Sequence, residues 1–155
     1  MNTDKKISRR EALKRMGFAL MSGAIASSGL LSLASCETKR SKRIIFYFTG
    51  TGNSLYIARQ LAGENAELLS IPQMVKRGKY EFEADEIGIV YPIYGHMPPY
   101  MVRQFIQKAK LKAEYKFAVL TYGARKCDAV EIWDRISRKA DNAFDYINTI
   151  IMVDN

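Results

Sequence analysis

Hydrophobic runs and amphipathic segments alternate along the chain from residue 43 onward. Five short apolar runs predict buried strands at residues 43–48, 66–71, 86–92, 116–123 and 146–153. Between them, apolar residues at helical spacing predict helices over 53–63, 98–111 and 128–143. The segment 72–85 follows neither period, and we expect it to be irregular with at most one helical turn. Strands that are apolar on both sides and alternate with helices indicate an α/β fold, a doubly wound parallel sheet between helix layers with strand order 2-1-3-4-5.

The first 35 residues have the pattern of a secretory signal peptide. A basic head is followed by an uncharged stretch and then by small residues. The stretch SRREALK at residues 8–14 resembles a twin-arginine export signal, and LASC at residues 33–36 resembles a lipobox, in which Cys36 is lipidated. We therefore expect a signal peptide at 1–35, the lipidated Cys36 with a basic tether at 36–43, and a folded domain at 44–155. An ordinary N-terminal membrane helix with a chance LASC is the alternative.

Charge and cysteine content limit the classes of partner. The net charge is +8, and half of it belongs to the first 35 residues, so the remaining chain is only mildly basic. No long basic stripe is interleaved with aromatic residues, so we do not expect a nucleic-acid partner. The two cysteines, Cys36 and Cys127, form no CxxC pair, so this chain alone does not supply the ligands of a zinc site or an iron–sulfur cluster. A disulfide between them in an oxidising compartment is an alternative to lipidation of Cys36.

The loop TGTGNS at residues 49–54 follows the first predicted strand and opens the first predicted helix. Backbone N–H groups at a helix N-terminus favour an anion, and the threonine and serine hydroxyl groups add donors. A Walker loop would need a lysine after a glycine, a dinucleotide fingerprint would need a glycine where Leu55 stands, and a low-molecular-weight tyrosine phosphatase would need a cysteine. The loop is therefore suited to a terminal phosphate held by neutral donors.

The stretch FYFTGTGNS at residues 46–54 resembles the phosphate-binding loop of flavodoxin-like domains, which bind flavin mononucleotide (FMN). IGIVYPIYGHMPPYMVRQFI at 87–106 and VLTYGA at 119–124 are similar to the next two flavin-site segments of that family. The resemblance runs from about residue 43 to 155 and is nearest to domains that often precede a bacterial-type ferredoxin domain. It implies a cofactor site made of Thr49, Gly50, Thr51, Gly52, Asn53 and Ser54 for the phosphate, and of Tyr91, Pro92, Ile93, Tyr94, Gly95, His96, Thr121, Tyr122, Gly123 and Ala124 beside the isoalloxazine.

Several of these residues also have a purely structural interpretation. Tyr91 is nearly as well explained as a core residue at the end of a strand. His96, the single histidine of the chain, is better explained as a solvated loop residue than as a catalytic one. Trp133, at helical spacing, is expected in the core.

The chain departs from the family pattern in two respects. The mature part is basic, whereas flavodoxins are usually acidic, so an acidic or anionic partner or a membrane surface fits it. The sequence also stops just after the last predicted strand, so the final helix of the fold is absent. We expect a C-terminally incomplete domain, with a chain that covers the open sheet face as the alternative.

These observations favour an exported, membrane-anchored electron-transfer protein that binds FMN and exchanges electrons with a redox partner such as a ferredoxin-like protein. An FMN-dependent reductase of quinones or similar acceptors, and a binding lipoprotein without flavin, are the alternatives. No catalytic base and no metal ligand is assigned.

Overall fold

The computed structural model describes residues 42–152. The predicted signal peptide, Cys36 and most of the tether lie outside the described residues. Arg43, which we predicted both as the end of the tether and as the start of the strand at 43–48, is the first residue of strand β1, where its guanidinium pairs with Glu86.

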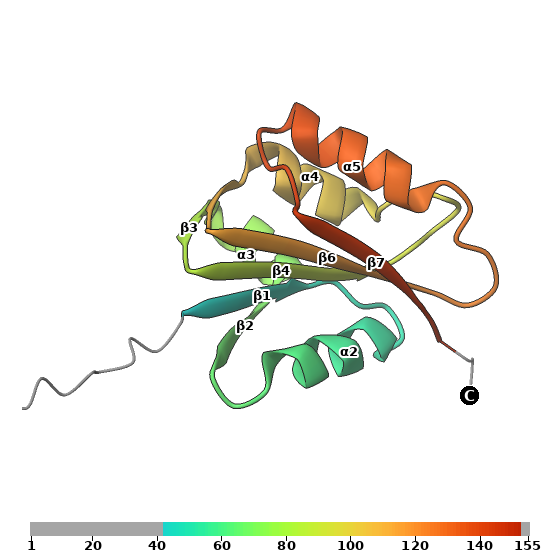
Figure 1. Cartoon of the computed structure of the whole chain (residues 1–155), viewed down its shortest axis with the longest axis horizontal. Coiled ribbons are helices and arrows are strands. Elements are labelled where there is room, and N and C mark those ends of the chain that lie inside the picture. Colours follow the sequence, from blue (N-terminus) through green and yellow to red (C-terminus); the bar gives the residue numbers. More distant parts are fainter. Residues whose placement is uncertain (1–41, 153–155) are drawn as a thin grey trace, which may run out of the picture. The chain divides into compact units, whose positions relative to one another are not determined.

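The centre of the domain is a five-stranded parallel sheet with the order β2-β1-β4-β6-β7 (Figure 1). In chain order these strands are β1 (Arg43–Tyr47), β2 (Ala66–Ser70), β4 (Glu86–Pro92), β6 (Tyr115–Tyr122) and β7 (Tyr146–Ile151). This is the predicted order 2-1-3-4-5, and the α/β class is confirmed. β4, in the centre, is buried along almost its whole length, as a strand covered on both faces must be.

Four helices cover the two faces of the sheet unequally (Figure 1). Helix α2 (Asn53–Ala62) packs on one face, against a small cluster that contains Ile45, Val90 and Val119. The helices α3 (Ile71–Arg77), α4 (Tyr100–Lys108) and α5 (Ala129–Lys139) lie on the other face over the larger core. Trp133 is fully buried in that larger core, which confirms its predicted role.

The segment 72–85 is more regular than we predicted. Pro72 lies in the first turn of α3, where its missing N–H costs nothing. Strand β3 (Glu81–Glu83) follows and pairs in parallel with β5 (Lys110–Lys112), which ends the predicted helix 98–111 early. Asn142 holds this region together. Its buried side-chain amide forms hydrogen bonds with four backbone groups, at the end of α4, in β5 and at the end of α5.

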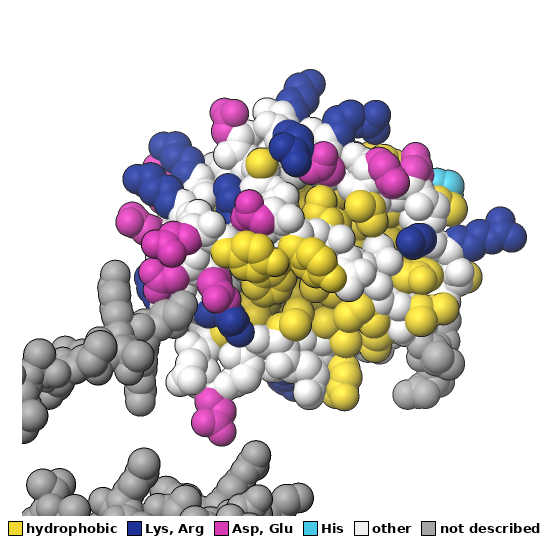
Figure 2. All heavy atoms as spheres, in the orientation of Figure 1, with side chains coloured by type: hydrophobic (Ala, Val, Ile, Leu, Met, Phe, Trp, Pro, Cys, Tyr) yellow, Lys and Arg dark blue, Asp and Glu magenta, His cyan; other side chains and the backbone are white. Residues whose placement is uncertain are grey.

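Beside α2, the start of β6 and the strand β7 are only partly covered on this face by the described residues. Figure 2 shows hydrophobic side chains gathered on this face. Phe117 and Ile150 are partly buried there, and the strand alternation places Tyr115 and Tyr146 on the same side. Phe117 lies over Gly88, where a Cβ atom would approach its ring to 2.4 Å.

Candidate functional site

The carboxyl ends of the parallel strands bring three predicted loops to one edge of the sheet. The loops after β1, β4 and β6 line a cavity of about 210 Å³. Of the predicted site residues, those that line it are Thr51, Asn53, Pro92, Ile93, Tyr94, Thr121, Tyr122 and Gly123. In open parallel sheets, ligands bind at this edge, where the strand order reverses between β1 and β4.

The loop after β1 presents a helix start without an internal cap. Gly52 occupies the N-cap position with a left-handed φ of 101°, and no side chain caps α2. The N–H of Gly52 donates to Thr49 Oγ1 at 2.9 Å, which fixes the turn and leaves the Thr49 hydroxyl hydrogen free to donate. The N–H groups of the first helical turn have no carbonyl acceptor within the helix. They therefore offer a set of neutral donors to an anion.

Ser54 is buried at the start of α2 and takes a role that the sequence did not indicate. Its hydroxyl oxygen lies 2.8 Å from that of Thr121, and both side chains are almost fully buried. The N–H of Ile93 donates to the carbonyl oxygen of Thr121 at 2.8 Å. Thr121 therefore joins all three loops, and the Ser54 hydroxyl takes part in this connection.

The loop after β4 makes a tight hairpin at residues 94–97. Tyr94 and Met97 exchange two backbone hydrogen bonds, of 3.0 and 3.1 Å, and Gly95 and His96 both have positive φ between them. The Tyr94 ring is 51% exposed and meets the Phe48 ring edge-on. Its hydroxyl lies over Gly50, where a Cβ atom would come within 2.5 Å. Tyr94 thus reaches across from the second loop to the first, as a flat amphipathic surface at the mouth of the cavity.

Tyr91 points away from this cavity. It is fully buried in the larger core, and its ring centre lies 5.0 Å from that of Trp133. Burial raises the pKa of the Tyr91 hydroxyl well above its ordinary value, and the hydroxyl has no hydrogen-bond partner among the described residues. The Tyr91 side chain is therefore placed as a core residue, and only its backbone belongs to the strand end that borders the site.

The remaining predicted residues surround the cavity without lining it. Gly95 and His96 form the exposed turn of the hairpin, and Ala124 is exposed after β6. His96 Nδ1 lies 3.3 Å from a carboxylate oxygen of Asp128, and both side chains are exposed. This pair ties the hairpin to the residue that precedes α5.

Met152 was not among the residues predicted for the site. This residue follows β7 and lines the cavity, and its N–H donates to the carbonyl oxygen of Tyr122 at 2.7 Å. The predicted parallel order could have identified it, because the end of the fifth strand must reach the same edge as the others.

The described part of the chain has no candidate for a metal site or for a membrane-spanning helix. Among residues 42–152, no group of three or more His, Cys, Asp and Glu side chains is placed to hold a metal ion. Within the same residues, no helix is both long enough and apolar enough to cross a bilayer.

Comparison with known proteins gives matches in structure only. No protein-family model matches the chain, and no curated protein matches its sequence. Among solved structures, it is similar to a flavoprotein from Lactobacillus acidophilus NCFM in complex with FMN, with 12% identity and a TM-score of 0.52 over 70% of this chain and 93% of the other. It is also similar to the two-electron reduced flavodoxin of Megasphaera elsdenii, with 16% identity and a TM-score of 0.53 over 73% and 88% of the two chains.

A third match is a putative flavoprotein from Bacteroides eggerthii DSM 20697, with 17% identity and a TM-score of 0.54 over 74% of this chain and 90% of the other. At identities this low, the structural similarity shows a shared architecture and nothing further. The observed strand order agrees with that architecture. The described part of the chain therefore has the flavodoxin-like fold, an α/β fold built on a parallel sheet with order β2-β1-β4-β6-β7.

Proposed function

We propose that this protein binds FMN at the cavity between the loops after β1, β4 and β6 and transfers electrons to a partner protein. The observation that carries the proposal is the uncapped start of α2, preceded by a glycine-rich turn, at the edge of a cavity lined by two tyrosines. The N–H groups of the first turn of α2, with the hydroxyl groups of Thr49 and Thr51, would hold the terminal phosphate. Two of the similar solved structures are named as a flavoprotein in complex with FMN and as a flavodoxin.

The residues around the cavity support a carrier more than an acid–base enzyme. Among the described residues, the lining consists of Thr, Asn, Pro, Ile, Tyr, Gly and Met, without a carboxylate, histidine or lysine. Tyr94 and Tyr122 would bound the ring system, and the backbone after β4 and β6 would set the polarity around it. FMN would supply one- and two-electron chemistry when bound. In this proposal the protein's own residues bind and orient it and limit its contact with water.

The phosphate loop can be tested with the full chain, purified, mixed with FMN or riboflavin and freed of excess ligand. We expect flavin absorption bands to stay with the protein and FMN to bind more tightly than riboflavin. Thr51→Glu places a carboxylate beside the phosphate and should weaken FMN binding by about tenfold or more. Gln60 is exposed in the last turn of α2. Gln60→Glu adds the same charge away from the loop and should leave FMN binding unchanged.

A folded, colourless protein would refute the cofactor assignment. Equal affinity for FMN and riboflavin would refute the role of the loop. Rapid oxidation of NADH or NADPH with a quinone as acceptor would show that the protein is a reductase and not an electron carrier. Reduction of the bound flavin without such turnover would support electron transfer to a protein.

We further propose that the protein is exported and anchored to a membrane through lipidated Cys36. The proposal rests on the twin-arginine-like and lipobox-like motifs in the first 36 residues. Mass spectrometry of the membrane fraction should find an N-terminal diacylglyceryl cysteine. Cys36→Ala should release the protein from membranes, and retention of this variant would contradict the anchor.

A further inference from the structure

A second hollow lies on the opposite side of the larger core from the sheet, between helices α4 and α5. It has a volume of about 470 Å³. We call it the α4–α5 groove, and its principal residues are Arg103, Arg135, Lys139, Met97, Ile136 and Ala140. Three cations and three apolar side chains therefore line the hollow, and no carboxylate of the described residues lines it.

The three cations of the groove are not neutralised by the described part of the chain. None of them forms a salt bridge within residues 42–152. The neighbouring Asp134 is engaged instead by Arg138, whose Nε lies 2.8 Å from both of its oxygens. The Nε of Arg103 is buried without a hydrogen-bond partner, and the guanidinium carbon lies 5.9 Å from the exposed ring of Tyr100. The positive charge of the groove is therefore available to an outside anion.

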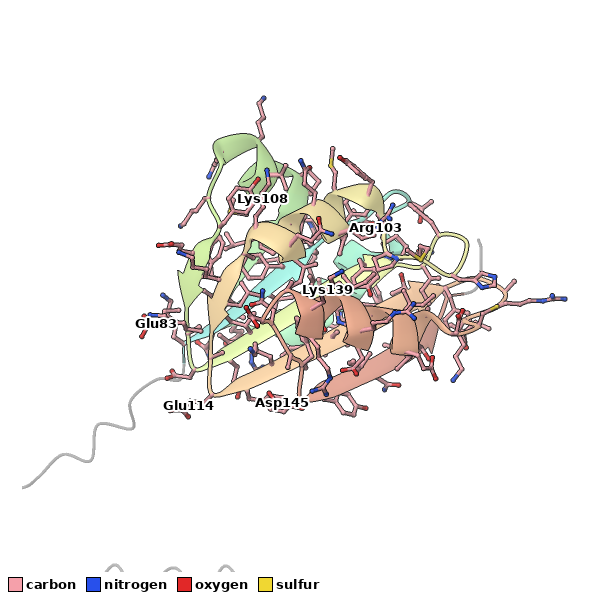
Figure 3. All side chains as sticks on the ribbon, turned by 90° about the horizontal axis from the view of Figure 1, so that it is seen from above. Glu83, Arg103, Lys108, Glu114, Lys139 and Asp145 are labelled. Atoms are coloured by element: carbon pink, nitrogen blue, oxygen red, sulfur yellow. The ribbon has the colours of Figure 1, made fainter. Side chains whose placement is uncertain are left out.

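Three carboxylates of this side lie at the other end of the sheet, whereas Glu131 and Asp134 belong to α5 itself. Figure 3 shows Arg103 and Lys139 on the two neighbouring helices, with Glu83, Glu114 and Asp145 toward the end where the strands begin. Glu114 directly precedes β6, and Asp145 directly precedes β7. The lining of the groove itself is positively charged, because its three cations have no carboxylate among the described lining residues.

We propose that the α4–α5 groove is the docking surface for an acidic segment of a partner protein, one that carries carboxylates and at least one apolar side chain. The planar guanidinium groups of Arg103 and Arg135 suit carboxylates, which they bind in a forked geometry. Met97, Ile136 and Ala140 would receive the apolar side chain. The hollow is open and bordered by long exposed side chains, which suits a protein segment better than a small molecule, whose sites enclose most of the ligand.

The position of Met97 connects the groove to the proposed flavin site. Met97 lines the groove and closes the hairpin whose first residue, Tyr94, lines the flavin cavity. An acidic partner in the groove would therefore sit beside the hairpin. That this partner is the electron-transfer partner rests on the proposed function, whereas the docking itself does not.

The test uses the full chain and a fluorescein-labelled twelve-residue peptide of glutamate and aspartate with two central leucines. We expect binding by fluorescence anisotropy that weakens as salt rises from low to moderate concentration, because exposed charges are screened. Amide NMR shifts should cluster on α4, α5 and residues 94–97. The same peptide with glutamine and asparagine in place of its acids should bind at least about tenfold more weakly.

Two groove variants and one matched control locate the interaction. Arg135→Gln/Lys139→Gln removes two exposed charges and should weaken peptide binding by about tenfold. Arg103→Gln alone should weaken peptide binding by nearly the same factor. Arg59→Gln/Lys76→Gln removes two exposed charges on α2 and α3 and should leave binding within about twofold. FMN retention should be the same in all three variants.

Several results would overturn the proposal. These are an equal loss in the control variant, NMR shifts centred on the open face of β6 and β7, or binding of anionic phospholipid vesicles but not of the peptide. Peptide binding with no FMN retention would refute the proposed function and leave the docking surface standing. FMN retention with no peptide binding would do the reverse.

Discussion

The buried hydrogen bond between Ser54 and Thr121 gives a quantitative test of how the site is held together. The two hydroxyl oxygens lie 2.8 Å apart, 67 residues apart in the chain, and both side chains are 1–2% exposed. A neutral hydrogen bond contributes about 1 kcal/mol net, while a buried hydroxyl left without a partner costs about 1–3 kcal/mol. Ser54→Ala and Thr121→Val should therefore each lower the free energy of unfolding by about 1–2 kcal/mol. The double variant should lose no more than the worse single variant.

The assay is urea unfolding followed by circular dichroism for the wild type, both single variants and the double variant. The expected coupling energy between the two positions is about 1 kcal/mol or more. Ser137→Ala is the control, because Ser137 is equally buried and its hydroxyl donates to the Asp134 carbonyl in its own helix. Its effect should add to that of Thr121→Val. Additivity of Ser54→Ala and Thr121→Val within about 0.3 kcal/mol would refute the reasoning.

Three further predictions follow from the core. Tyr91→Phe should keep FMN binding and leave stability at pH 7 equal or higher by about 1 kcal/mol, because it removes an unpartnered buried hydroxyl. Since burial raises the Tyr91 pKa above 10, the folded state keeps a proton that the unfolded state loses, and stability should fall as pH rises above about 10. Urea titrations at pH 9–11 should show a smaller fall in Tyr91→Phe, and weakened FMN binding would instead place Tyr91 in the site. Asn142→Ala breaks three buried hydrogen bonds and one partly buried one, and should lower the free energy of unfolding in urea by about 3–4 kcal/mol. A loss below about 1 kcal/mol would contradict the proposed role of Asn142 in holding this region together. Gly88→Ala should lower the free energy of unfolding in urea by about 1–3 kcal/mol, and by less in a Phe117→Leu background. Equal losses in both backgrounds would show that the Phe117 ring is not the obstacle.

The order and type of the main elements could be predicted because their signals are local. β1, β4 and β6 are nearly continuous apolar runs, and α5 carries its apolar residues at helical spacing. The short strands β3 and β5 could not be predicted, because each has three residues with a single buried side chain. They exist as strands only because the packing of α3 and α4 brings residues 81 and 110 together.

For the candidate site, the sequence determined which loops would meet. A glycine-rich turn between a buried strand and a helix, in a parallel sheet, lies at the carboxyl edge because chain direction places it there. The structure decided which side chains reach that edge. Tyr91 and Tyr94 are three residues apart, yet one packs against Trp133 and the other extends toward Gly50, because the hairpin at 94–97 turns the chain.

The contacts that hold the site together were decided by tertiary structure alone. The sequence predicts Ser54 as a donor to a ligand, but in the structure its hydroxyl lies beside that of Thr121. Thr121 belongs to β6, which is two positions from β1 in the sheet. The α4–α5 groove likewise gathers cations from two helices that are about thirty residues apart in the chain. Sequence patterns report what a residue does within its own helix or strand, whereas partners on other elements are set by packing, which only the folded chain specifies.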